Sequence, residues 1–246
     1  MNTESTDKAA WTSRAGGRKY NEDALHFEER GGIAFAALAD GLGGHRGGAA
    51  ASRTAIEAAC SAFWEKGSIS ADALESCARR AKEALVQVQQ ADPSFNRMKT
   101  TLVLWASDGT QAVWGHVGDS RLYHFRQERL QSRTKDHSLP QKLADIGEIA
   151  EEAIRHHEDR NRLTAVLDGS TPLRWAAGST RLQADGEDTF LLCSDGFWEL
   201  VTEVDMCTTL AAAPSPQAWL KVMEEKLLTQ APTDHDNYTA LAVFSG

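Results

Sequence analysis

The strongest structural signal in the sequence lies at residues 33–48, which read IAFAALADGLGGHRGG. The uninterrupted apolar run Ile33–Ala39 is a strand's length, which predicts a buried β-strand. It ends abruptly at Asp40, where a loop rich in glycine begins. Glycine tolerates tight turns and lets the backbone approach other groups closely. The stretch therefore predicts a buried strand that is followed by the carboxylate of Asp40 at the start of a glycine-rich loop.

Helical periodicity follows this loop directly. Small and apolar residues recur at helical spacing over residues 49–64 and again over 70–90, which predicts two long helices. The pattern then changes to short β-rich runs at 101–106, 111–117 and 121–125, separated by turns that contain Asp and Gly. These runs predict an antiparallel meander.

A polar segment, residues 134–168, interrupts the strands and predicts a small helical flap. The remaining elements are expected as strands at 173–182, 188–193 and 238–244, and as helices at 204–212 and 217–229. Strands and helices are grouped along the chain and do not alternate strictly. This grouping predicts an α+β fold, with mostly antiparallel sheet and helices packed outside it.

Composition limits the function classes. The 246 residues suffice for one domain with a sizeable core, and we expect a single domain over residues 1–246. Lys and Arg number 26 against 35 Asp and Glu, and the resulting charge of -9 disfavours nucleic-acid binding. The apolar runs are far shorter than the ~20 residues of a membrane span. The N-terminus lacks the pattern of a secretory signal, so we expect a cytoplasmic protein. Reduced thiols are expected at Cys60, Cys77, Cys193 and Cys207.

Acidic residues follow or precede several of the predicted strands. They are Asp40 in LADG, Asp119 in VGDS, Asp195 in CSDG and Asp236 in HDNY, with Glu22 and Asp23 in NEDA nearer the N-terminus. An Asp beside Gly or Asn often only caps a turn, and for each residue alone that explanation stays open. Carboxylates gathered at the ends of one sheet would repel one another, so they would need protons or cations.

Oxygen ligands without a His or Cys cluster favour Mg²⁺ or Mn²⁺, and several carboxylates suit a pair of ions. Two such ions acidify a shared water and hold a phosphoryl group in line, which suggests metal-assisted phosphoester hydrolysis. Arg18 would lie near Glu22 and could bind two phosphate oxygens, or it could be a solvated surface residue. The carbonyl of Gly41 could be an added ligand, or its loop could be merely flexible.

Seven strings resemble, in order, the motifs of metal-dependent protein phosphatases of the PP2C, or PPM, family. They are GRKYNEDA (17–24), DGLGGH (40–45), VGDSRLY (117–123), TKDHS (134–138), RNRLT (160–164), LLCSDGFWELV (191–201) and DNYTALAV (236–243). The resemblance spans about residues 13–244. It implies an α-β-β-α four-layer sandwich of two mostly antiparallel sheets flanked by helices. It also implies hydrolysis of phosphoserine and phosphothreonine in proteins by attack of a metal-bridged hydroxide.

The resemblance implies roles for individual residues as well. Asp40 would bridge two Mn²⁺ or Mg²⁺ ions, with the Gly41 carbonyl on one ion and Asp195 and Asp236 on the other. Asp119 matches a position that, together with Asp195, holds a third and weaker ion. Glu22 and Asp23 would act mainly through metal-bound waters, and Arg18 would clamp the phosphate. The flap varies within the family and contributes to substrate choice.

The sequence departs from the family pattern at a few positions. Leu42 stands where eukaryotic members place a His that is a proposed general acid, so the leaving-group proton donor stays open. His45 is the nearest candidate, although a loop His that bonds only the backbone is the alternative. The segment AVLDG at 165–169 also departs from the usual end of the flap.

Other functions remain as alternatives at this point. One is a catalytically silent module that binds phosphoproteins, and another is a two-metal hydrolase of a different phosphoester. For the phosphatase we expect a phosphoprotein substrate, an opposing cytoplasmic Ser/Thr kinase, no nucleic-acid or membrane partner, and a monomer. The strings SDGFWELV (194–201) and RNRLT (160–164) are similar to those of phosphatases in bacterial type VI secretion control.

Overall fold

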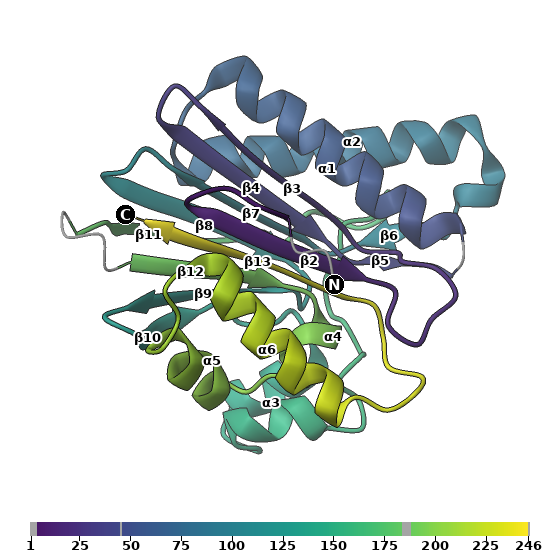
Figure 1. The fold of residues 1–246 in the computed structure, drawn as a ribbon. Helices are drawn as coiled ribbons and strands as arrows, with labels where there is room; N and C mark the ends of the chain where they lie inside the picture. Colours follow the sequence, from purple (N-terminus) through teal and green to yellow (C-terminus); the bar gives the residue numbers. More distant parts are fainter. Residues whose placement is uncertain (1–3, 45, 184–187, 246) are drawn as a thin grey trace.

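The computed structural model describes residues 4–44, 46–183 and 188–245. Two β-sheets pack face to face, and helices cover the outer face of each sheet (Figure 1). This arrangement is an α+β sandwich of four layers, as predicted. His45, a candidate proton donor in the sequence, lies outside the described residues.

The first sheet has five strands in the order β11-β8-β7-β4-β3, all antiparallel to their neighbours. The strands are β3 (Ala24–Arg30), β4 (Ile33–Ala39), β7 (Leu102–Ser107), β8 (Gln111–Val117) and β11 (Ala176–Arg181). β4 lies inside the sheet between β3 and β7, and its last five residues are buried. The buried strand predicted at 33–39 is therefore confirmed.

The second sheet has six antiparallel strands in the order β1-β2-β13-β12-β9-β10. They are β1 (Glu4–Ser5), β2 (Ala9–Arg14), β9 (Arg121–Arg126), β10 (Arg129–Arg133), β12 (Asp188–Cys193) and β13 (Tyr238–Ser245). A separate two-residue ladder joins β5 (Gly41–Leu42) to β6 (Lys99–Thr100). This short ladder connects the glycine-rich loop to the segment that leads into β7.

Helices α1 (Arg46–Lys66) and α2 (Ala71–Ala91) pack on the five-stranded sheet. Helices α4 (Asp195–Trp198), α5 (Glu203–Leu210) and α6 (Pro216–Gln230) pack on the other sheet. Helix α2 begins at an N-cap where Ser70 Oγ accepts a hydrogen bond from the Ala73 amide at 3.1 Å. A short 3₁₀ helix, η1 (Pro93–Phe95), follows α2. The predicted long helices are confirmed.

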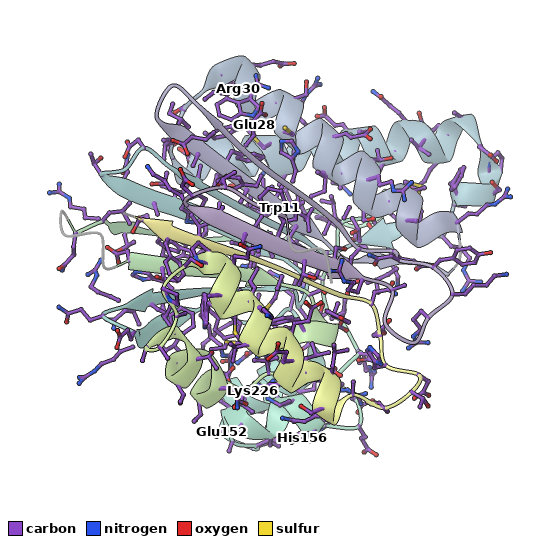
Figure 2. All side chains as sticks on the ribbon, viewed as in Figure 1. Trp11, Glu28, Arg30, Glu152, His156 and Lys226 are labelled. Carbon is purple, nitrogen blue, oxygen red and sulfur yellow. The ribbon has the colours of Figure 1, made fainter. Side chains whose placement is uncertain are left out.

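An apolar layer between the sheets holds the sandwich together. Trp105, Leu38 and Phe190 are fully or almost fully buried there, and Trp11 of β2, labelled in Figure 2, packs against this cluster. Register within each sheet places the end of β4, the turn between β8 and β9, the end of β12 and the start of β13 at one end of the molecule. The acidic residues predicted to follow or precede these strands therefore gather at that end.

The polar segment contains α3 (Leu139–Asp145) and the 3₁₀ helix η2 (Glu151–His156), so its predicted helical character is confirmed. Isolated bridges attach it to the body through Thr100 and Leu167 and close it through Ser138 and Leu163. Arg155 donates to Glu203 at 2.7 Å and Arg160 donates to Glu199 at 2.8 Å. The segment is therefore docked on α5 and on the end of α4.

Periodicity alone misses several strands. β3 reads ALHFEER and lies at a sheet edge, where none of its residues is fully buried. β10 reads RLQSR and is also an exposed edge strand, so its hydrophobic signal is weak. β2 was not predicted either, and β11 begins at Ala176, later than expected. In the described ranges, no helix has the length and hydropathy of a membrane span.

Candidate metal and phosphate site

A cleft of about 490 Å³ lies at the end of the sandwich where the acids gather. It is lined by Arg18, Lys19, Tyr20, Glu22, Asp40, Gly41, Leu42, Gly43, Gly44, Asp119, Asn161, Leu163, Asp195, Asp236 and Asn237. Every predicted site residue except Asp23 therefore lines one cleft. Asp23 lies behind the wall, where it is almost completely buried.

Two threonines hold the backbone of Asp40 at the end of β4. The Asp40 amide donates to Thr101 Oγ1 at 2.9 Å. Its carbonyl accepts bonds from the Thr101 amide at 2.9 Å and from Thr100 Oγ1 at 2.7 Å. Thr101 Oγ1 is in turn 2.7 Å from Ser120 Oγ, next to Asp119. These contacts fix the carboxylate against the β8–β9 turn, and the sequence motifs did not single them out.

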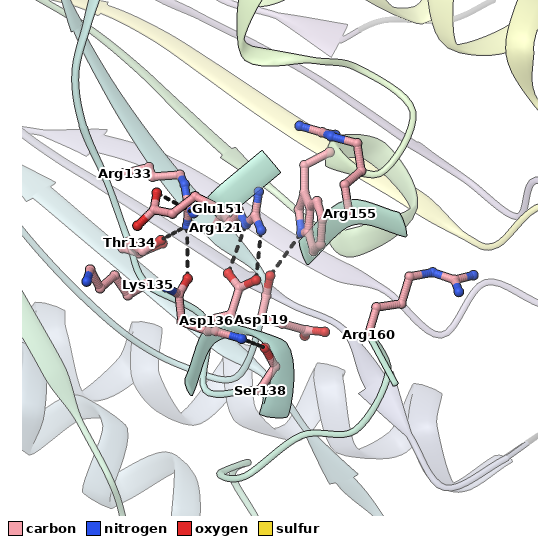
Figure 3. Close-up of polar contacts among 12 residues, drawn as sticks. Asp119, Arg121, Arg133, Thr134, Lys135, Asp136, Ser138, Glu151, Arg155 and Arg160 are labelled. Atoms are coloured by element: carbon pink, nitrogen blue, oxygen red, sulfur yellow. Dashed lines mark hydrogen bonds and ion pairs between the residues drawn. The ribbon is translucent and has the colours of Figure 1, made fainter. Parts of the chain in front are cut away.

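A buried ion pair lies next to Asp119 (Figure 3). Arg121 donates from Nε and Nη2 to the two carboxylate oxygens of Asp136, both at 2.8 Å. The two side chains are only 3% and 1% exposed. The Arg121 guanidinium also lies 3.4 Å from the ring centroid of Trp198, whose Nε1 donates to the Asp119 carbonyl at 2.9 Å. The pair therefore anchors the turn that carries Asp119.

An Asp136→Asn variant should lower the free energy of unfolding by about 3–5 kcal/mol, because it removes the bidentate carboxylate of the buried Arg121 guanidinium, whose remaining carboxylate partner is Glu203 at 3.5 Å. Asp145→Asn is the matched control, since Asp145 pairs with Lys135 at 2.6 Å on the surface. That variant should cost no more than about 1 kcal/mol. Urea unfolding of the two variants beside the parent protein measures both values. Equal effects would contradict the anchoring role.

Asp195 and Asp23 are joined through Ser194, the N-cap residue of α4. Ser194 Oγ donates to Asp23 Oδ2 at 2.7 Å, and it accepts a bond from the Thr239 amide at 2.9 Å. Asp23 Oδ1 is buried and has no hydrogen-bond partner among the described residues. A buried carboxylate oxygen without a hydrogen-bond donor destabilises the folded protein, so we expect a proton, a water molecule or a cation at Asp23 Oδ1.

The backbone of Glu22 and the loop that contains Gly41 pack so closely that no residue larger than glycine fits at position 41. The Glu22 amide donates to Asn237 Oδ1 at 2.8 Å, and its carbonyl accepts from Ser52 Oγ at 2.6 Å. A Cβ added to Gly41 would lie 2.1 Å from the Gly48 carbonyl oxygen and 2.6 Å from the Glu22 carbonyl oxygen. The glycines are therefore required because three backbone segments meet at the cleft.

Burial and mutual repulsion raise the pKa of these carboxyls. Burial, followed by the charges of Asp195 and Asp23, raises the pKa of Asp40 well above its ordinary range. The pKa of Asp119 is raised for similar reasons, by burial first and then by Asp195. The pKa values of Asp23 and Asp195 rise to about 7, again mainly because of burial. At neutral pH this site is deficient in positive charge.

Among the described residues that line the cleft, Arg18 is the one cationic side chain in an ion pair with an acidic residue of the site. Arg18 Nη2 lies 3.2 Å from Asp236 Oδ2, and both side chains are about half exposed. An oxygen-only donor set, raised carboxyl pKa values and an unpartnered buried oxygen together fit a hard divalent cation. The residues present therefore suit Mn²⁺ or Mg²⁺ better than a soft metal.

Residues 12–231 match a family model described as protein phosphatase 2C. The chain belongs to the protein phosphatase 2C family. The serine/threonine phosphatase stp of Listeria welshimeri is 32% identical over 240 residues, which cover 94% of this chain and 93% of that protein. The solved structure of PppA, described as a key regulatory component of T6SS in Pseudomonas aeruginosa, has a TM-score of 0.79 and 30% identity. The match covers 99% of both chains.

The catalytic domain of the phosphatase PstP, solved in complex with two manganese ions, has a TM-score of 0.80 and 26% identity. That match covers 96% of this chain and 97% of the PstP domain. The chain is thus a metal-dependent protein serine/threonine phosphatase. The predicted fold, family and enzyme class are confirmed.

The cysteines of this protein phosphatase 2C have no part in the chemistry of the cleft. Cys193 is fully buried, and burial raises the pKa of its thiol far above the ordinary range, so it is a core residue and not a nucleophile. All four cysteines are free thiols, as expected.

His137 stacks on His116 with ring centroids 4.8 Å apart, and burial lowers its pKa to about 4. It packs in the wall behind the site.

Asn237 is the functional residue that the sequence motifs described least well. Its side-chain amide donates to the carbonyls of Ala15 and Tyr20, both within 2.9 Å, while its oxygen accepts from Glu22. One side chain therefore ties the loop of Arg18 to the start of β13. Its position directly after Asp236 was the available signal, since an Asn beside a strand start commonly bonds the backbone.

Proposed function

We propose that Asp40 bridges two divalent ions in the cleft, with the Gly41 carbonyl on one ion and Asp195 and Asp236 on the other. The observation that carries this assignment is the group of carboxyls at the cleft, with Asp119 buried and Asp40 and Asp195 half-buried, whose pKa values are raised by loss of solvent contact and by one another. Such a group is stable at neutral pH when cations occupy it. Bound ions would supply the electrophilic charge and the acidified water that phosphoester hydrolysis needs.

Glu22 and Asp23 complete the proposed site from behind, mainly through water molecules. Asp23 Oδ1 is supported in this role because it is buried and has no donor among the described residues. Asp119 and Asp195 are proposed to hold a third, weaker ion, since the charge of Asp195 is the second cause of the raised pKa of Asp119. Either Mn²⁺ or Mg²⁺ is compatible with these oxygen donors.

Arg18 is proposed to bind the phosphoryl group of the substrate. Its guanidinium lies at the mouth of the cleft beside Asp236, where it is half exposed and available to a ligand. A planar guanidinium can donate two parallel hydrogen bonds to phosphate oxygens. The same residue would thereby orient the phosphate toward the ions.

Arg18→Ala should lower kcat/KM for a phosphothreonine peptide by roughly 10–100-fold, mainly through KM, because the bidentate contact to the phosphate is lost. Arg18→Lys should recover part of the loss, since it restores charge without the fork. Arg53→Ala, on an exposed position of α1, should leave the steady-state constants unchanged. An unaltered kcat/KM in Arg18→Ala would assign Arg18 to the solvated surface instead.

The proposed physiological role is to reverse a cytoplasmic Ser/Thr kinase on a phosphoprotein substrate, as a monomeric single domain with a flap at residues 134–168. The four free thiols support a reducing compartment. The similarity to PppA over almost the whole chain supports a role in type VI secretion control. The kinase and the phosphoprotein would then belong to that system.

The first test is phosphate release from a phosphothreonine peptide by the purified full chain with Mn²⁺ or Mg²⁺. We expect turnover with the metal and none with excess EDTA, with recovery when metal is added back. Tight phosphopeptide binding without phosphate release, by folded and metal-loaded protein, would instead indicate a silent binding module.

A further inference from the structure

The catalytic cleft continues into a trough along the flap. A second hollow of about 430 Å³ shares Leu42, Asn161 and Leu163 with the cleft. A third hollow of about 490 Å³ shares Thr164 and Arg174 with the second. Because consecutive hollows share lining residues, they lie side by side and extend away from Asp40 and Asp195. We call this series of hollows, from Leu42 to Arg174 and beyond, the flap trough.

Cations without carboxylate partners line the flap trough. Lys99 and Arg174 line its second hollow, and Lys142 of α3 lines the third. All three side chains are exposed, and in the described parts of the chain no carboxylate lies within 4.0 Å of them. Arg174 and Lys142 line the third hollow together with His137. These three residues come from segments far apart in the sequence.

The acids of the flap trough are already engaged. Asp168 accepts bonds from the Ser170 and Thr171 amides and lies 4.0 Å from Lys82 Nζ. Asp145 pairs with Lys135 at 2.6 Å. Asp136 is held by Arg121 in the buried pair described above. The trough therefore has a positive excess, although the whole chain carries a charge of -9. Such a local reversal of sign selects for acidic partners.

We propose that the flap trough binds an acidic segment of the phosphoprotein substrate that flanks the phosphorylated residue. This inference rests on the proposed function of the adjoining cleft. With the phosphoryl group at Arg18 and the ions, the flanking chain would pass Leu42 and reach Lys99, and then Arg174 and Lys142. Aspartate and glutamate side chains would pair there with the free ammonium and guanidinium groups. Basic flanking residues would be repelled.

The test compares phosphothreonine peptides that differ only in their flanks. One pair carries four acidic or four basic residues on the N-terminal side of the phosphothreonine, and a second pair carries them on the C-terminal side. In one of the two pairs, N-terminal or C-terminal, we expect the parent enzyme to hydrolyse the peptide with the acidic flank with an about tenfold higher kcat/KM than the peptide with the basic flank. The preference should shrink as salt is added, because these charges are exposed.

The double variant Lys99→Glu/Arg174→Glu should lose or reverse this preference and should hydrolyse p-nitrophenyl phosphate like the parent enzyme. That small substrate does not extend beyond the cleft, so its turnover reports that the variant is folded and loaded with metal. Lys221→Glu/Arg129→Glu has the same change in net charge at other exposed positions and should keep the preference.

Outcomes for the trough and for the cleft are distinguishable. Equal preference in the parent enzyme and in Lys99→Glu/Arg174→Glu, with p-nitrophenyl phosphate turnover intact, would overturn the trough and leave the phosphatase site in place. Loss of the preference for acidic flanks in both double variants would assign that preference to the net charge of the protein. This result would also overturn the proposal that the flap trough binds an acidic segment. Absence of turnover on every substrate by the parent enzyme would instead remove the proposed function itself.

Discussion

An Asp40→Asn variant loaded with Mn²⁺ should release phosphate from a phosphothreonine peptide at least about a thousandfold more slowly than the parent enzyme. The amide is nearly the same size as the carboxylate but carries no negative charge and cannot bridge two cations. Since Thr100 and Thr101 hold the backbone of this residue, the local structure should persist in the variant. The loss of activity would therefore come from impaired binding of the metal ions and not from a change in the local structure.

The variant should also be more stable than the parent protein in EDTA at neutral pH. Burial and four neighbouring carboxyls destabilise the charged form of Asp40, and asparagine removes that charge. Calorimetric unfolding in EDTA and in Mn²⁺ measures both states. Asp72→Asn, on an exposed position of α2, should match the parent protein in activity and stability. Full activity of Asp40→Asn would contradict the bridging role.

In the metal-free protein, the carboxyl of Asp195 should lower the free energy of unfolding as the pH rises from about 4 to 7, and partly buried histidines such as His137, whose pKa is lowered to about 4, should contribute with the opposite sign below about pH 6.5. The pKa of Asp195 is about 7 in the folded protein, against an ordinary value of 3.8. Between these values the folded state binds more protons than the unfolded state, so the free energy of unfolding falls with increasing pH. A shift of this size in one carboxyl corresponds to about 4 kcal/mol. Asp23, whose pKa is also about 7, contributes with the same sign.

Asp195→Asn isolates this effect from the other titrating groups. In EDTA the variant should gain stability relative to the parent protein as the pH rises, and the difference should level off above about pH 8. Mn²⁺ should reverse the order, since the parent protein then gains binding energy that the variant has lost. A stability difference that stays constant across this pH range in EDTA would show that the carboxyl is not perturbed by folding.

Local patterns predicted most of the strands and helices that bury one face or the whole segment, with β2 (Ala9–Arg14) as an exception. The run Ile33–Ala39 is apolar at every position because β4 lies inside its sheet, and the long helices show a clear period because one face packs on that sheet. The edge strands β3 and β10 escaped prediction for the converse reason. None of their residues is fully buried, so burial left no periodic trace in the sequence.

The acidic residues of the site were predicted from their places beside strands and from the order of the motifs. Their supports could not be predicted, because each joins segments that only long-range packing brings together. Asn237 ties the loop of Arg18 to the start of β13, Thr101 links Asp40 to the β8–β9 turn, and Arg121 stacks on Trp198 while it pairs with Asp136. No spacing along the chain encodes such contacts.

The sequence by itself determined the family, the α+β class and the set of carboxylates, because strand ends and turn residues leave local patterns. The tertiary structure alone decided which residues share the cleft, how far their pKa values rise, and that Lys99, Lys142 and Arg174 line one trough. Those properties depend on exclusion of water and on electrostatic contacts between distant segments. They arise only when the register of the two sheets and the docking of the flap bring the segments together.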